Sequence, residues 1–82
     1  MTEKAIIDAI APVFHDVFED ISLVITRDLD ASKVEAWDSL NHITLIIELE
    51  ALTGVTFSTD QLAGMANTGD LIDALRREGY HG

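Results

Sequence analysis

Three side chains near the middle of the sequence have the types that nucleophilic chemistry requires. Asp38, Ser39 and His42 supply a carboxylate, a hydroxyl and an imidazole, the parts of a serine-hydrolase triad. However, Ser39 lies in no Gly-x-Ser-x-Gly turn, and no oxyanion hole is evident. His42 follows Ser39 by only three residues, and a surface or partner contact is the simpler role for it. We therefore expect that the protein is not an enzyme.

A metal site is not indicated either. Three oxygen-bearing residues have the opening spacing of a calcium loop: Asp28, Asp30 and Ser32. The glycine that such a loop needs at its sixth position is replaced by Lys33, and the closing glutamate at the twelfth by Ser39. The histidines are dispersed along the chain at His15, His42 and His81. We expect a solvated acidic loop and no metal ion.

The size and charge of the chain narrow the possible functions further. We expect 82 residues to form one domain, residues 1–82, whose small core leaves little room for a catalytic pocket. Fifteen Asp and Glu against five Lys and Arg give a net charge of -10, which repels nucleic acid and anionic lipid and favours basic protein surfaces. There is no cysteine, no recognisable export signal and no run of the roughly 20 apolar residues that span a membrane. We expect a monomeric cytoplasmic protein that binds neither nucleic acid nor membrane.

The spacing of apolar residues predicts an all-α domain with three main helices and one short helix. A first stripe with helical spacing predicts a helix over residues 3–19, capped by Thr2 and kinked or broken near Pro12. This stripe consists of Ile6, Ile10, Val13, Phe14, Val17, Phe18 and Ile21. Residues 20–38 then lack a period and predict a long loop, whose apolar residues and Trp37 pack back onto the helices.

Capping residues set the bounds of the remaining helices. Residues 39–53 predict the clearest helix, capped by Asp38 or Ser39 and ended by Gly54. Ser58 and Gln61 have capping-box spacing and predict a short helix, which Leu62 and Met65 anchor in the core. The last helix begins near Asn67 or Thr68 and stops at Gly79. Because no alternating pattern demands a sheet, we expect a helical bundle.

The helix over residues 39–53 has apolar residues on two sides. One side is predicted to face the core: Leu45, Ile46, Leu49 and Leu52. Leu40, Ile43 and Ile47 gather on roughly the opposite side. A domain of this size can hardly bury both, so the second stripe is predicted to stay exposed as a docking surface for a partner. The alternative is that the long loop folds over it.

The segment around Ser39 resembles the acyl carrier protein family. Asp38-Ser39-Leu40 follows a long loop and opens an amphipathic helix in a small acidic chain, and the likeness of helix order extends over essentially the whole sequence. The resemblance implies a four-helix bundle of the acyl-carrier type, in which Ser39 carries 4′-phosphopantetheine from coenzyme A. It also implies that Asp38 assists the phosphopantetheinyl transferase and its metal, that Leu40 belongs to the recognition surface, and that acyl groups travel as thioesters on the arm. From the residues alone, Ser39 could instead be an ordinary helix cap.

The docking helix departs from that of the best-known fatty-acid carriers, which has several acidic residues along its exposed side. The matching stretch here contains Asn41, His42, Thr44 and Ala51. The acidic residues that remain are Asp38, Glu48 and Glu50. We therefore expect a carrier for a specialised fatty-acyl or polyketide pathway, or alternatively an aminoacyl or peptidyl carrier. Its expected partners are the transferase, an acyl- or aminoacyl-loading ligase or transferase, and downstream synthases with basic docking surfaces, which would bind Leu40, Ile43, Ile47, Glu48 and Glu50. A helical interaction domain that carries nothing is the alternative from another class.

Overall fold

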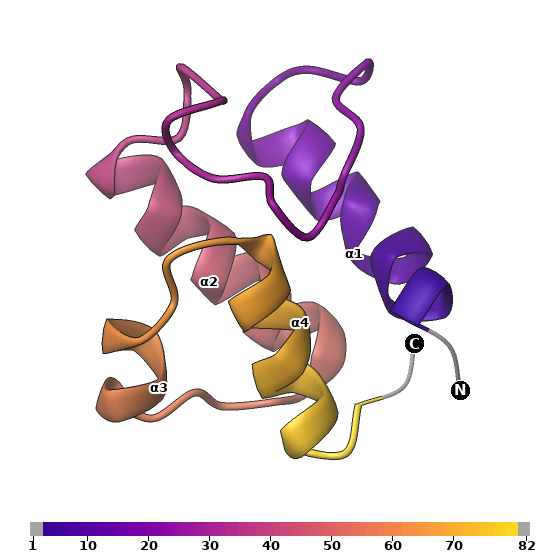
Figure 1. Cartoon of the computed structure of the whole chain (residues 1–82), viewed down its shortest axis with the longest axis vertical. Helices are drawn as coiled ribbons and strands as arrows, with labels where there is room; N and C mark the ends of the chain where they lie inside the picture. The colour runs from indigo at the N-terminus through magenta and orange to yellow at the C-terminus, as the bar shows by residue number, and fades with distance from the viewer. Residues whose placement is uncertain (1–2, 81–82) are drawn as a thin grey trace.

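Four helices and a long loop make up the computed structural model, which describes residues 3–80 (Figure 1). The helices are α1 (Glu3–Val17), α2 (Ser39–Thr53), α3 (Thr59–Ala63) and α4 (Thr68–Arg77). Within residues 3–80 there is no strand, which confirms the all-α prediction with one short helix. The predicted cap Thr2 and the residue His81 lie outside the described residues. The loop 18–38 covers the end of the bundle where α1 finishes and α2 begins (Figure 1).

Helix α1 buries a narrower stripe than the sequence predicted. Ile6, Ile10 and Phe14 are buried, and Phe18 follows them into the core. The helix ends at Val17, two residues early, because Glu19 adopts a left-handed conformation with φ 52° that turns the chain. Ile21 is consequently 89% exposed, so its predicted place in the stripe is wrong.

A break at Pro12 is excluded, since α1 runs through this residue without interruption, and a kink there stays a prediction. Pro12 has no N–H to donate to the carbonyl of Asp8, one turn earlier. The proline is exposed, however, so water can satisfy that carbonyl. A hydrogen bond from water at the surface of α1 can therefore replace the one that Pro12 cannot donate.

The long loop packs back onto the helices, as predicted. Its buried side chains are Ile25, Leu29, Val34 and Trp37. The indole of Trp37 meets Phe14 edge-on, with ring centroids 5.8 Å apart, and lies 5.3 Å from the ring of Phe18. The loop therefore shares one hydrophobic core with the helices, and Trp37 fixes its last turn.

Caps decide the bounds of the later helices. Gly54, at φ 74°, ends α2 and donates its N–H to the carbonyl of Glu50. Ser58 and Gln61 form the predicted capping box of α3, while Asn67 is the N-cap of α4. Leu62 and Met65, predicted as buried anchors, are only half-buried at the edge of the core.

Candidate functional site

Ser39 is the first residue of α2, and its side chain is exposed. Asp38, not Ser39, is the N-cap, because the Asp38 carboxylate accepts a hydrogen bond of 2.8 Å from the backbone N–H of Asn41. The alternative role of Ser39 as the helix cap is therefore wrong. Among residues 3–80, the Ser39 hydroxyl has no hydrogen-bond partner, so it is free to react.

Hydrogen bonds from α2 back to the loop hold the chain that precedes Ser39. The side-chain amide of Asn41 donates to the carbonyl of Ala36 over 2.7 Å. The indole N–H of Trp37 donates to Nδ1 of His42 over 3.0 Å, and the two rings stack at 18° with centroids 6.2 Å apart. Because Trp37 is itself packed against Phe14, these bonds connect the junction at Ser39 to the core.

The start of α2 presents positive backbone groups at the exposed hydroxyl. The N–H groups of Asn41 and His42 bond the side chain and the carbonyl of Asp38. Those of Ser39 and Leu40 have no partner among residues 3–80, as expected for the first turn of a helix. An anionic group attached to Ser39 would therefore meet two free donors and the positive end of the helix dipole.

Two shallow grooves lie along α2, and Ser39 lines the first of them. The first, of about 590 Å³, lies between the start of α2 and the connection before α4; Ser39, His42 and Met65 line it. The second, of about 530 Å³, lies between α2 and α3, where Ile47 and Leu62 line it. His42 and Ile43 line both grooves, so the two grooves adjoin at these residues, and the second groove is mainly apolar.

The second apolar stripe of α2 is uncovered, as predicted. Leu40, Ile43 and Ile47 are 73%, 57% and 58% exposed, which excludes the alternative that the loop folds over them. Leu45, Ile46 and Leu49 are buried. Leu52 is 49% exposed, so its predicted place in the core is wrong. The core face of α2 is thus narrower than expected, and its exposed face is wider.

The two glutamates predicted for partner binding differ in their surroundings. Glu48 is exposed. Glu50 is half-buried, and its carboxylate accepts a hydrogen bond of 2.9 Å from the backbone N–H of Phe57. Glu50 therefore helps hold the connection between α2 and α3, and a role for it in partner binding stays a prediction.

A solved structure resembles this chain along nearly its whole length. It is the solution NMR structure of a holo acyl carrier protein from Geobacter metallireducens. The two sequences are 38% identical, and the alignment covers 93% of this chain and 94% of that one with a TM-score of 0.82. The chain belongs to the acyl carrier protein family. Comparison with protein-family models and with curated proteins gives no match.

Membership of this family makes the protein a carrier and not an enzyme, and the geometry around Ser39 agrees. Asp38 bonds Asn41, and His42 bonds Trp37. No hydrogen bond joins Ser39 to His42 or to Asp38, so this acyl carrier protein has no assembled triad. In the loop that has the opening spacing of a calcium site, Asp28 accepts a hydrogen bond from Thr26 and Asp30 accepts two from Ser32, so both carboxylates bond residues of the loop itself.

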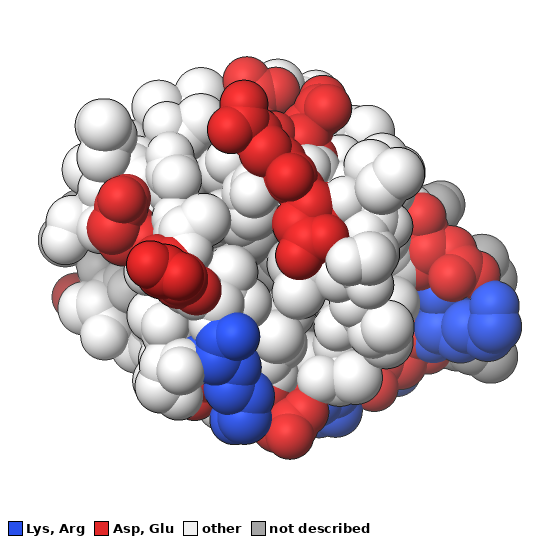
Figure 2. Space-filling model, turned by 90° about the horizontal axis from the view of Figure 1, so that it is seen from above, with Lys and Arg blue, Asp and Glu red and all other residues white. Residues whose placement is uncertain are grey.

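The surface of this carrier is strongly acidic at the loop end. Figure 2 shows several Asp and Glu side chains across that face and few Lys or Arg. Hydrogen bonds from the Ser22 hydroxyl and backbone lower the pKa of Asp20, and one from Thr26 lowers that of Asp28. These carboxylates stay charged in mild acid. No helix within residues 3–80 is long and apolar enough to cross a membrane.

Proposed function

We propose that this acyl carrier protein carries its acyl groups as thioesters on a 4′-phosphopantetheine arm joined to Ser39. The observation that carries the proposal is the exposed hydroxyl of Ser39, which has no partner among residues 3–80 and stands beside two free backbone N–H groups. The Geobacter metallireducens relative is a holo protein, the form with a prosthetic group. We also propose that residues 1–82 form a single carrier domain.

The residues at the start of α2 fit the attachment chemistry. In the transfer, the Ser39 oxygen forms a bond to the phosphorus on the pantetheine side of the coenzyme A pyrophosphate, the anhydride bond to that phosphorus breaks, and adenosine 3′,5′-bisphosphate leaves. The hydroxyl proton passes to a base of the separate transferase. The free N–H groups of Ser39 and Leu40 then face the phosphodiester, while the attached arm supplies the thiol that holds the acyl group.

Asp38 and Leu40 are proposed to recognise the transferase. One carboxylate oxygen of Asp38 caps α2, and the other has no partner among residues 3–80. That second oxygen remains available to the metal ion of the transferase. The exposed side chain of Leu40 offers an apolar contact beside it.

The exposed face of α2 is proposed as the docking surface for loading enzymes and downstream synthases. Its apolar centre consists of Leu40, Ile43 and Ile47. Exposed Glu48 follows Ile47 on the side of α2 that borders α1 and adds negative charge there, and Glu50 is a second candidate. An apolar centre with a few carboxylates near it suits a partner that combines apolar contacts with a basic docking surface.

The pathway is proposed to be a specialised fatty-acyl or polyketide pathway, with an aminoacyl or peptidyl pathway as the alternative. The support is the scarcity of acidic residues around the docking surface, where Asn41, His42 and Thr44 stand in place of carboxylates. Purified fatty-acid synthesis enzymes should therefore turn over the modified protein more slowly than they do a housekeeping carrier. Equal turnover would contradict this part of the proposal.

Intact-mass measurement tests the attachment. Incubation with coenzyme A and a broad-specificity transferase should add the mass of one phosphopantetheine. Ser39→Ala should abolish this gain completely, whereas Ser22→Ala, which changes an exposed loop serine, should leave it intact. An unchanged mass, under conditions that convert a known carrier fully, would favour an acidic interaction domain that carries nothing.

A further inference from the structure

The hydrogen bond between Trp37 and His42 determines which nitrogen of His42 carries its proton. An indole N–H can only donate, so Nδ1 of His42 must accept and be unprotonated. The proton of the neutral imidazole therefore lies on Nε2. The stacking of the two rings at 18° holds the imidazole in this orientation, and the burial of Trp37 holds the indole.

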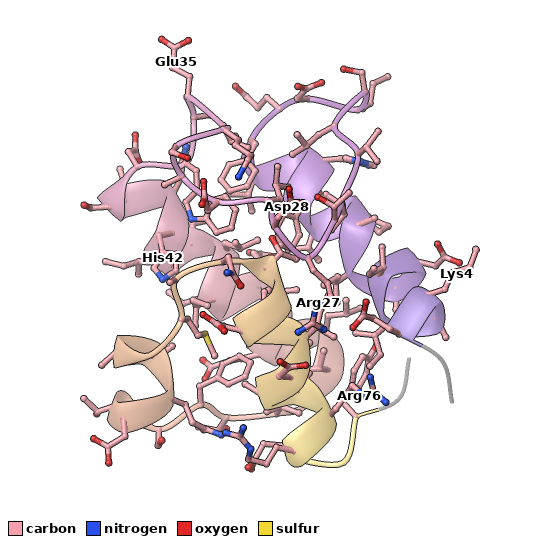
Figure 3. All side chains as sticks on the ribbon, in the orientation of Figure 1. Lys4, Arg27, Asp28, Glu35, His42 and Arg76 are labelled. Atoms are coloured by element: carbon pink, nitrogen blue, oxygen red, sulfur yellow. The ribbon has the colours of Figure 1, made fainter. Side chains whose placement is uncertain are left out.

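The protonated nitrogen of His42 has no partner within residues 3–80. His42 is half-buried, one turn after Ser39 on α2, and Figure 3 shows it on the side of α2 that looks toward the connection between α3 and α4. It lines both the groove beside Ser39 and the apolar groove between α2 and α3. A chain that is tethered to Ser39 and runs from the first groove into the apolar groove passes along His42.

The other side chain shared by the two grooves is Ile43, which offers no hydrogen bond. Met65, across the first groove, has only a weak acceptor sulfur. Of the two side chains that line both grooves, His42 is thus the one that has a strong donor. A passing group that satisfies this donor needs an acceptor, and amide and thioester carbonyls are such acceptors.

We propose that His42 is a positioning residue for the tethered arm, in which the Nε2–H donates a hydrogen bond to a carbonyl oxygen of that arm. This inference rests on the proposed attachment at Ser39. Trp37 contributes indirectly, because its bond to Nδ1 keeps the proton on Nε2. The free N–H groups of Ser39 and Leu40 can donate to the phosphate next to Ser39. The imidazole is then available to donate to the amide part of the arm.

The test compares unmodified and modified protein by NMR at pH 8, with the arm labelled with ¹³C and ¹⁵N. The ring ¹⁵N shifts of His42 should show the Nε2–H tautomer in both forms. The modified protein should also give cross-peaks between the ring protons of His42 and the arm, with a downfield shift of one arm carbonyl. His42→Leu should abolish that carbonyl shift. His42→Gln should restore it, because the amide offers an oxygen to Trp37 and an N–H to the arm.

Thr44→Val is the matched control, since Thr44 lies in the same turn but lines a different groove, between α1 and α2. It should leave the arm signals unchanged. An Nδ1–H tautomer, or arm carbonyl shifts that are equal in wild type and His42→Leu, would overturn the inference while the mass gain still supports attachment at Ser39. Variants that move only the ³¹P signal would overturn it too. Failure of the mass gain itself would remove both the attachment and this inference.

Discussion

The two carboxylate oxygens of Asp38 serve different purposes at the residue scale. One accepts the backbone N–H of Asn41 and so fixes where α2 begins. The other has no partner among residues 3–80 and faces the solvent beside Ser39. The same side chain therefore stabilises the domain and, under the proposed function, meets the transferase. Two substitutions can separate these contributions, because asparagine keeps a capping oxygen but loses the charge.

Asp38→Ala should lower the free energy of unfolding by about 1 kcal/mol, the usual cost of losing an N-cap, and Asp38→Asn by only a few tenths. Urea denaturation measures both values. The rate of phosphopantetheine transfer, followed by intact mass, should fall in both variants, because neither retains a carboxylate for the metal of the transferase. Full transfer to Asp38→Asn would contradict the proposed role of Asp38 in recognition.

The parts of this site that depend on neighbours in sequence could be predicted, and those that depend on tertiary contacts could not. Asp38 and Ser39 precede an apolar helix, so both were recognised as possible caps. The sequence could not decide between the two caps. In the structure Asp38 bonds Asn41, which leaves the hydroxyl of Ser39 free. The bond from Trp37 to His42 has no sequence signal, because it requires the indole to be placed by Phe14 from another element.

At the scale of elements, the loop and α4 are joined at a buried polar point. Thr68, the first residue of α4, is 0% exposed. Its backbone N–H and its hydroxyl both donate to the carbonyl of Leu29, each over 2.9 Å. The adjacent Gly69 donates its N–H to the carbonyl of Arg27 over 2.8 Å. These bonds hold the loop against the start of α4.

Thr68→Val keeps the shape of the side chain but removes its hydroxyl. It should lower the free energy of unfolding by about 1 kcal/mol, since one hydrogen bond is lost while the backbone N–H still satisfies the Leu29 carbonyl. Urea denaturation measures the change. Thr56→Val, at an exposed position with no side-chain hydrogen bond to the described residues, is the control and should change stability by less than about 0.5 kcal/mol. Equal values for the two variants would show that the buried bond contributes nothing.

Helical period and caps predicted the elements well, but the ends of α1 depended on the loop. The stripe through Phe14 was correct because it spans full turns against the core. Ile21 has the same spacing, yet the left-handed turn at Glu19 removes it from that face. Pro12 was tolerated because its side of the helix meets water. Exposure of this kind is a property of packing, and the local sequence does not encode it.

Arg27 joins three parts of the whole molecule. Its guanidinium pairs with Glu3 at the start of α1 and, over 2.8 Å, with Asp73 of α4, while Arg27 itself belongs to the loop (Figure 3). The hydrogen bonds from Arg27 lower the pKa of Asp73, against a smaller opposing effect of partial burial. A lowered pKa means that the folded protein binds fewer protons than the unfolded chain. This ion pair therefore stabilises the fold above about pH 4 and ceases to do so as the pH falls through the lowered pKa.

Asp73→Asn should accordingly be less stable than the wild type at pH 7, and this difference should shrink as the pH falls below about 4. Urea denaturation at a series of pH values gives the difference directly. Asp16→Asn is the control, because the Asp16 carboxylate makes no ion pair with a described residue, and this variant should not show the loss of stability at pH 7 that Asp73→Asn shows. A deficit for Asp73→Asn that grows in acid would contradict a lowered pKa for Asp73 in the folded protein.

Charge repulsion across the whole molecule should make the stability of the fold depend on salt. The net charge is -10, and the longest extent of the described domain is 30 Å. At about 0.01 M salt the screening length is roughly 30 Å, so carboxylates on opposite sides still repel, whereas at 0.15 M it is about 8 Å. Few attractive pairs oppose this, because only Lys4, Arg27 and Lys33 form ion pairs within residues 3–80.

The midpoint of thermal unfolding should therefore rise between 0.01 and 0.15 M NaCl, where a gain of about 1 kcal/mol would raise it by roughly 4–8 °C. Circular dichroism at 222 nm measures the midpoint. The double variant Asp16→Asn with Glu35→Gln removes two exposed negative charges that form no ion pair with the described residues, and its rise with salt should be smaller. Choline chloride at equal ionic strength should act like NaCl, because screening needs no specific ion. A midpoint that falls with salt would mean that the ion pairs of Arg27 outweigh the repulsion among the acidic residues.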